Sequence, residues 1–292
     1  MGRAAWRASP ALIMPTPSPL LADVVFAIRE HYKHRVDYVR AMNRLTLQAK
    51  AILRRTCDGD KMAAERLYRK LDGPLEELTK EEFAAAIHVA PLLEARQPLE
   101  ANRKREEKEL ERLAKTLPVW PWVESVRGIG PLALAQIVGC TGDLSNYANP
   151  AKVWKRMGLG LVNGERQRKV AGDVELAIEH GYSPERRSVM FVIGDSIVKQ
   201  GDAYRQVYLD RLVTEHEKTV AEGLTPVATM PATVESWARR DLPALTLVKP
   251  KTFDKAKHRA ANVLHLRAKR YMEKRLLRDL WTAWRQYGAE VS

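Results

Sequence analysis

One short stretch of the sequence combines a glycine turn with basic side chains. Residues 125–159 read SVRGIGPLALAQIVGCTGDLSNYANPAKVWKRMGL. Gly128 and Gly130 can adopt positive φ, Ile129 between them can anchor the turn in a core, and Pro131 suits the first position of a following helix. Backbone amides at the start of such a helix can bind a phosphate oxygen. The pattern is typical of a helix-hairpin-helix that contacts a nucleic-acid backbone without reading its sequence.

Basic residues beside this turn favour the same interpretation. They are Arg127, Lys152, Lys155 and Arg156 within the stretch, followed by Arg166, Arg168 and Lys169. Clusters of this kind indicate contact with DNA or RNA. The alternative is a tight turn between two core helices, in which the glycines serve geometry only.

A second basic element lies near the end of the chain. Between residues 249 and 285, twelve basic residues stand against three acidic ones. Apolar residues recur there at every fourth position, so one face of a helix should pack while other faces meet a polyanion. The residues expected to make that contact are Arg267, Lys269, Arg270, Lys274 and Arg275. A solvated basic face on a core helix is the alternative, and the two are compatible.

The composition of the whole chain points the same way. Its 292 residues carry a formal charge of +13, which attracts polyanions, nucleic acid foremost and an anionic membrane surface as the lesser option. No apolar run approaches membrane-spanning length, and no secretory signal is recognisable. Two cysteines, Cys57 and Cys140, suit a reducing cytoplasm and are too few for a disulfide framework.

The first part of the chain is expected to form two long helices. Residues 20–55 contain no Pro or Gly, and their apolar residues alternate spacings of four and three, as in a heptad seam. A second, highly charged segment follows, in which Pro91 and Pro98 should kink or interrupt the helix. Residues 20–117 therefore form either an antiparallel helical hairpin, a coiled coil within one chain, or a pair across a homo-oligomer.

The rest of the chain is expected to be a compact helical domain. We place a boundary at the proline-containing residues 118–122, so that residues 118–292 follow residues 20–117 and a flexible lead-in of residues 1–19. Asn149-Pro150 and Ser183-Pro184 are helix-start signals, and Asn163-Gly164 predicts a short β-hairpin. Residues 222–250 should be irregular around one short helix, and a last helix should run from about 253 to 287. The predicted fold class is mainly α.

Residues 126–162 resemble the C-terminal domain of the IS-one-ten family of bacterial insertion-sequence transposases. The shared features are the Gly128–Pro131 opening, Gly142-Asp143 with Tyr147, Gly158-Leu159, and a closing helix similar to residues 270–285. The resemblance covers about residues 120–287 by motif and the front part by helix pattern only. It implies a DNA-recombination protein of the bacterial cytoplasm, associated with the nucleoid, with DNA and also a guide RNA as candidate partners.

Two features of that family are missing from the sequence. Its members begin with a RuvC-like nuclease domain whose carboxylates bind magnesium, and we expect none in front of the first helix. They also carry a serine shortly after the Gly-Leu element, where this chain has Asn163, Glu165 and Gln167. Ser183 comes next and is better explained as a helix cap. Mg²⁺ is therefore expected only if a RuvC-like partner protein supplies the nuclease site, and no other cofactor is evident.

The sequence identifies no catalytic residues and no metal site. His31 and His34 lie one turn apart, but no third ligand is evident, so we expect surface histidines. Asp195 is a single carboxylate, and a two-metal site needs several. We expect no DNA cleavage by this chain alone. Two functions remain open: a transposase-type DNA-binding protein in recombination, and a non-catalytic accessory or relic protein that binds DNA or guide RNA.

Overall fold

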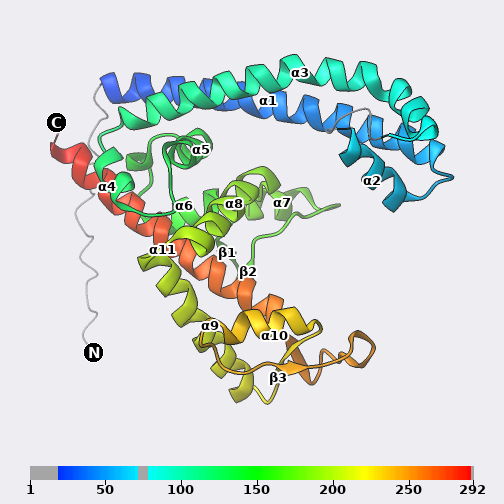
Figure 1. Ribbon diagram of the computed structural model, residues 1–292. Helices are drawn as coiled ribbons and strands as arrows, with labels where there is room; N and C mark the ends of the chain where they lie inside the picture. Colours follow the sequence, from blue (N-terminus) through cyan, green and yellow to red (C-terminus); the bar gives the residue numbers. More distant parts are fainter. Residues whose placement is uncertain (1–18, 72–77, 291–292) are drawn as a thin grey trace, which may run out of the picture.

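The computed structural model describes residues 19–71 and 78–290, and this part of the chain is mainly α-helical, as the sequence predicts. A long two-helix arm lies along one side of a compact body (Figure 1). The lead-in predicted for residues 1–19 falls, apart from Pro19, outside the described residues. Within the described ranges, no helix has both the length and the hydropathy that a bilayer span requires.

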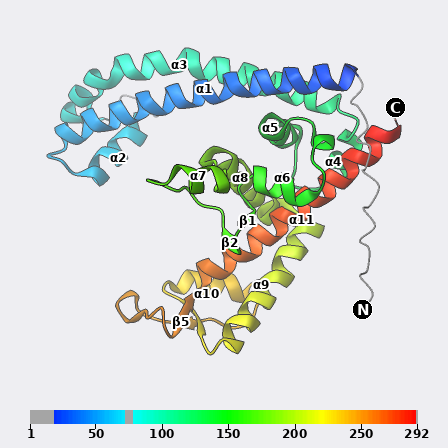
Figure 2. The ribbon, with the colours of Figure 1, turned by 180° about the vertical axis from the view of Figure 1, so that it is seen from behind.

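The arm is an antiparallel hairpin of α1 (Pro19–Thr56) and α3 (Lys80–Lys115), which lie side by side in Figures 1 and 2. The heptad seam of α1 is covered by the chain's own helices. Its fully or nearly buried members are Val25, Ile28, Tyr32, Met42, Ala49 and Leu53. Of the alternatives for residues 20–117, the intramolecular hairpin is therefore the one observed. A homo-oligomer stays a prediction, and this seam is not free to form it.

Two details of the arm differ from expectation. A further short helix, α2 (Lys61–Lys70), follows α1 and begins at Asp60, whose side chain accepts from two backbone amides. Helix α3 passes through Pro91 and Pro98 without ending, so of the predicted kink or interruption the interruption is wrong. Both prolines are exposed, and so are the residues four positions before them. Water can therefore satisfy the two carbonyls that lose their helical partners.

The hydrophobic core does not divide at residue 118. One cluster of buried side chains joins the end of the arm to the body, and it includes Ile28 of α1, Leu110 of α3, Leu134 of α5 and Leu276 of α11. A smaller cluster lies at the other end of the arm around Leu53 and Val89. The predicted boundary at residues 118–122 is therefore wrong as a division between cores. The cause is that the arm buries its near end against the body.

The body is built around α11 (Ala261–Glu290), whose apolar stripe is buried from Leu264 to Trp284. The elements before it are α4 (Trp120–Ser125), α5 (Pro131–Thr141), the 3₁₀ turn η2 (Leu144–Asn146), α6 (Pro150–Arg156), β1 (Leu161–Val162), β2 (Glu165–Arg166), α7 (Val174–His180), α8 (Pro184–Gln200) and α9 (Ala203–Ala221). The local signals are confirmed. Asn149 and Ser183 cap α6 and α8, and Asn163 and Gly164 both have positive φ in the β1–β2 turn.

A small parallel sheet lies where an irregular segment was expected. Strand β3 (Thr225–Ala228) pairs with β4 (Thr246–Leu247) on one side and β5 (His258–Ala260) on the other. Helix α10 (Pro231–Ala238) and the 3₁₀ turn η3 (Pro250–Thr252) lie between strands in sequence. The last helix accordingly begins at Ala261 rather than near 253. Strands of two to four residues are too short for a recognisable alternation, and parallel pairing depends on contacts distant in sequence.

The glycine turn between α4 and α5 needs glycine at one position only. Gly128 has φ +94°, and a Cβ there would lie 3.1 Å from the Ile197 backbone. Gly130 is the N-cap of α5 with φ −111°, and a Cβ there would meet nothing within 4 Å. The expectation of positive φ at Gly130 is therefore wrong, because this residue already has the extended conformation of an N-cap.

The same substitution at the two glycines should have opposite effects. Gly128→Ser places a side chain in a strained conformation against the end of α8, and we expect it to lower the free energy of unfolding by roughly 2 kcal/mol. Gly130→Ser creates a favoured N-cap in open space and should leave stability unchanged or slightly raised. Urea unfolding of both variants measures the difference. Equal effects would contradict this account of the turn.

Candidate nucleic-acid interface

Two adjoining cavities form a basic groove that begins at the arm and continues on the body. One, of about 460 Å³, lies between α1, the end of α5 and the start of α8, and the other, of about 450 Å³, lies between η2, α6 and α8. Arg156 and Arg186 line both. Two carboxylates, Asp37 and Glu185, also line the groove. The basic side chains that define it are Arg29, Lys33, Arg40, Lys152, Lys155, Arg156 and Arg186.

Helix α6 presents three of these side chains because its other face is fixed in the core. Val153 and Met157 are buried, while Lys152 and Lys155 are exposed. Arg156 is held in place by a hydrogen bond of 2.9 Å from its Nε to the Cys140 carbonyl. Across residues 19–71 and 78–290, no carboxylate lies within ion-pair distance of these three cations. They are therefore available to an external anion.

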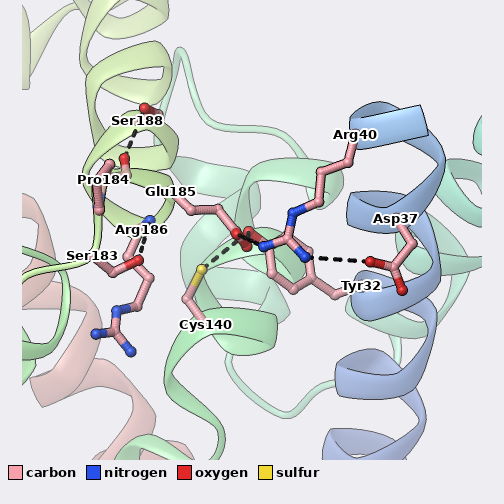
Figure 3. Close-up of polar contacts among 9 residues, drawn as sticks. All are labelled: Tyr32, Asp37, Arg40, Cys140, Ser183, Pro184, Glu185, Arg186 and Ser188. Carbon is pink, nitrogen blue, oxygen red and sulfur yellow. Dashed lines mark hydrogen bonds and ion pairs between the residues drawn. The ribbon is translucent and has the colours of Figure 1, made fainter. Parts of the chain in front are cut away.

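The start of α8 contributes Arg186. Ser183 caps the helix by accepting a hydrogen bond from the Arg186 amide at 3.4 Å (Figure 3). Because Ser183 lines the groove, the helix begins there. The guanidinium donates to the Gly181 carbonyl at 3.3 Å, while its buried Nε has no partner in the described part of the chain. Burial and the nearby charge of Arg156 lower the pKa of Arg186. An anion between the two guanidiniums would relieve this repulsion.

The arm closes the other side of the groove. Arg40 pairs with Glu185 at 2.8 Å and with Asp37 at 3.4 Å, as Figure 3 shows. Tyr32 donates to Glu185 at 3.4 Å and accepts from the Cys140 thiol at 3.3 Å. Burial raises the pKa of Tyr32 and raises that of Cys140 to about 11. Both groups are neutral near pH 7, so Cys140 is not an activated thiolate.

The glycine turn and the α6 cations do not form one patch, contrary to the sequence interpretation. The turn holds Arg127, Gly128, Ile129 and Gly130 at the start of α5, whereas Gly139 and Cys140 border the groove at its end. A helix of 11 residues separates the two by roughly 16 Å. Arg127 is exposed and Ile129 packs against the core, as expected. No side chain of the described residues caps the start of α5.

Lys269 cannot contact a polyanion, and its prediction as a binding residue is wrong. Its side chain is fully buried, forms an ion pair with Asp195, and lies 3.3 Å from the centroid of the Phe191 ring. Gly194 makes room for it, because a Cβ there would lie 2.7 Å from Lys269 Cε. The sequence shows the charge of this residue but not the buried partner.

The other basic residues predicted on α11 are paired with carboxylates, stacked on an aromatic ring or partly buried. Arg267 pairs with Glu215 at 3.2 Å and Arg275 with Asp279 at 3.6 Å. Lys274 lies over the Trp154 ring at 5.3 Å. Burial, followed by repulsion from Arg166 and Arg187, lowers the pKa of Arg270 to about 10. The helix is thus mainly a core element, which is the alternative that the sequence left open.

The β1–β2 hairpin carries a smaller exposed basic group. Arg166, Arg168 and Lys169 all lie at the surface, and Arg168 is 3.7 Å from Glu165. Arg166 is close enough to Arg270 to affect its ionisation. Because none of these residues lines the basic groove, they form a separate patch.

The Gly142-Asp143 motif with Tyr147 has a structural role. Gly142 has φ +75°, and Asp143 is buried, where it accepts from the Ser145 amide at 2.8 Å and from Trp284 Nε1 at 2.9 Å. The Tyr147 carbonyl accepts from Trp281 Nε1 at 2.9 Å. The motif therefore ties the loop after α5 to α11 and presents no reactive group.

Sequence reasoning missed the contribution of the arm and of α8 to the groove. Arg29, Lys33 and Arg40 lie on one face of α1, at spacings of four and seven that follow the helical period. That spacing is a signal the sequence did contain. Arg186 had no such signal, since only the packing of α6 and α8 against α5 and α11 brings it to Arg156.

Comparison with known proteins gives no identity for the chain. No known family model matches it, and neither the curated proteins nor the solved structures include a significant match. The case for nucleic-acid binding depends on the charges and geometry of the groove.

Proposed function

We propose that the protein binds the phosphate backbone of DNA in the basic groove. The observation that carries this proposal is the convergence of seven basic side chains, against two carboxylates, from α1, α6 and α8. Five of the seven have no carboxylate within ion-pair distance among the described residues: Arg29, Lys152, Lys155, Arg156 and Arg186. Such a site binds by charge, so recognition is tolerant of sequence.

The resemblance of residues 120–287 to transposases supports a role in transposition or recombination. In this proposal a RuvC-like partner supplies the carboxylates and Mg²⁺ for strand cleavage, and this chain holds the DNA. Ser183 lies at the edge of the groove, but it serves as the cap of α8. No histidine or carboxylate in the described ranges hydrogen-bonds to its hydroxyl, so the proposal assigns it no nucleophilic role.

A guide RNA is the second candidate ligand, because the groove selects phosphates and RNA carries them too. The protein is then a non-catalytic accessory or relic of the same family. Binding of duplex DNA, branched DNA and single-stranded RNA in parallel separates the two candidates. A homo-oligomer, tested by light scattering on the full chain, would have to use a surface other than the α1 seam.

Salt dependence tests the proposal directly. If about six phosphates are engaged, affinity for duplex DNA should fall on the order of a thousandfold between about 50 and 200 mM salt. Fluorescence anisotropy with a labelled duplex measures this slope. Parallel incubations with and without Mg²⁺ should show binding but no nicking by this chain alone. A flat salt response would rule out the electrostatic groove, and nicking would show that the chain holds a complete catalytic site.

A further inference from the structure

Two histidines of α1 and one carboxylate of α3 meet on the arm, away from the basic groove. His31 Nδ1 lies 2.6 Å from Glu106 Oε2, and His34 Nδ1 lies 3.9 Å from Glu106 Oε1. One ligand atom from each residue lies within 4.8 Å of the other two. On α1 the histidines lie roughly half a turn from the face that bears Arg29 and Lys33. Glu106 is therefore the candidate third ligand, which the sequence could not identify.

The donor set matches a transition metal. Two neutral imidazoles and one carboxylate are typical zinc ligands, whereas Mg²⁺ and Ca²⁺ prefer oxygen donors alone. Tetrahedral coordination at about 2.0–2.1 Å requires donors roughly 3.4 Å apart. The distances from Glu106 oxygens to His31 Nδ1 and His34 Nδ1 are 2.6 and 3.9 Å, one shorter and one longer than that value. His34 has a side chain 58% exposed and can rotate to meet the ion.

Among the described residues, Glu106 has only the two histidines as charged or chargeable partners. The neighbouring cations Arg35 and Arg103 pair with Glu107, at 2.9 and 2.8 Å, and not with Glu106. Glu106 itself is only 14% exposed, and no arginine or lysine of the described chain lies within ion-pair distance of it. A largely buried carboxylate that faces only two imidazoles can exchange its hydrogen bond with His31 for a bound cation, which would compensate its charge.

We propose that His31, His34 and Glu106 bind one Zn²⁺ ion, which clips α1 to α3 on the side of the arm opposite the groove. Three protein ligands leave a fourth position to water. The ion joins helices that are 72 or more residues apart at these positions, so it should restrain their relative movement. This site is independent of nucleic-acid binding.

Metal titration of the full chain tests the site. The protein is prepared without a histidine tag and stripped with a chelator, then titrated with Zn²⁺ by calorimetry and with Co²⁺ by visible absorption. We expect one ion per chain, a tetrahedral Co²⁺ spectrum, and a rise in the thermal unfolding temperature with Zn²⁺. His34→Ala and Glu106→Gln should each weaken binding at least about tenfold.

His34 is the decisive position. Its exposed side chain lies 3.9 Å from Glu106. If His34 is only a neighbour of the site, its removal should leave the affinity for Zn²⁺ unchanged. If it is a ligand, its removal should weaken Zn²⁺ binding. His88→Ala removes an exposed histidine of α3 outside the cluster and is the matched control. Circular dichroism verifies that each variant is folded. Absence of binding at micromolar Zn²⁺, or equal affinity in His34→Ala and wild type, overturns the proposal.

Discussion

Replacing Lys152 and Lys155 together by glutamate is expected to weaken DNA binding at least about a hundredfold at moderate salt. Both lysines are exposed at the groove, and neither has a carboxylate partner in the described residues. The substitution removes two phosphate contacts and adds repulsion from two carboxylates. Because each phosphate contact contributes about 0.9 to the logarithmic salt dependence, the slope should also fall by about 2. Anisotropy titrations over a salt series measure both quantities.

A matched control separates the groove from net charge. Lys251→Glu with Lys255→Glu changes the total charge equally, at exposed positions near η3 and β5 that do not line the groove. This pair should weaken binding by less than about threefold, since only distant, screened charges change. Equal losses from the two double variants would mean that overall charge, and not the groove, attracts the DNA.

The position of the groove explains why charges so far apart in sequence can act together. Burial of the near end of the arm against α5 brings α1 beside the end of α6, at Arg156, and the start of α8, at Glu185. A phosphate backbone that follows the groove would contact Lys152 and Lys155 in the cavity on the body and Arg29 in the cavity beside the arm. Helices that are anchored in one core hold the backbone positions of these residues at fixed separation, which lowers the entropic cost of binding.

Features set by neighbouring residues were predictable from the sequence. Asn149-Pro150 and Ser183-Pro184 begin helices as expected, since an N-cap and its proline act within one turn. The Asn163-Gly164 turn follows equally from local conformational preference. The two long helices also follow from the spacing of apolar residues. That spacing did not show whether α1 would pack against α3 of the same chain or against a second chain.

Features set by distant contacts were not predictable. The short parallel sheet depends on β3 meeting β5 some thirty residues later, and nothing local marks those strands. Of the groove residues, those of α6 were named from the sequence, whereas Arg186 comes to the groove only through packing. Lys269 is the opposite case, because a basic residue in a basic segment looks exposed until its ion pair with Asp195 is seen. Charge counting alone cannot distinguish these outcomes.

The buried charged residues between α8 and α11 should make the stability of the fold depend on pH. Glu273 is fully buried and lies 3.0 Å from Arg187 Nη1. Gly194 admits it, since a Cβ there would lie 2.7 Å from Glu273 Oε1. Burial raises the pKa of Glu273 to about 7, although Arg187 and Lys269 act in the opposite direction. The desolvation cost thus exceeds the attraction of the two cations.

Stability should consequently fall as pH rises. Below pH 4.5, the ordinary pKa of this group, Glu273 is protonated in both the folded and unfolded chains. Between that value and about 7 the unfolded chain has lost the proton while the folded chain keeps it. Unfolding then releases a proton, so the free energy of unfolding decreases with pH, and above about 7 the loss is complete.

Glu273→Gln removes this titration and preserves the shape of the side chain. Relative to wild type, the variant should gain roughly 2–3 kcal/mol in free energy of unfolding between about pH 5 and pH 8. Denaturant unfolding at several pH values measures the difference, in which the other titrating groups largely cancel. Glu217→Gln, at an exposed position of α9, should show no such trend. A difference independent of pH would mean that Glu273 is ionised throughout, and that its pairing with Arg187 outweighs burial.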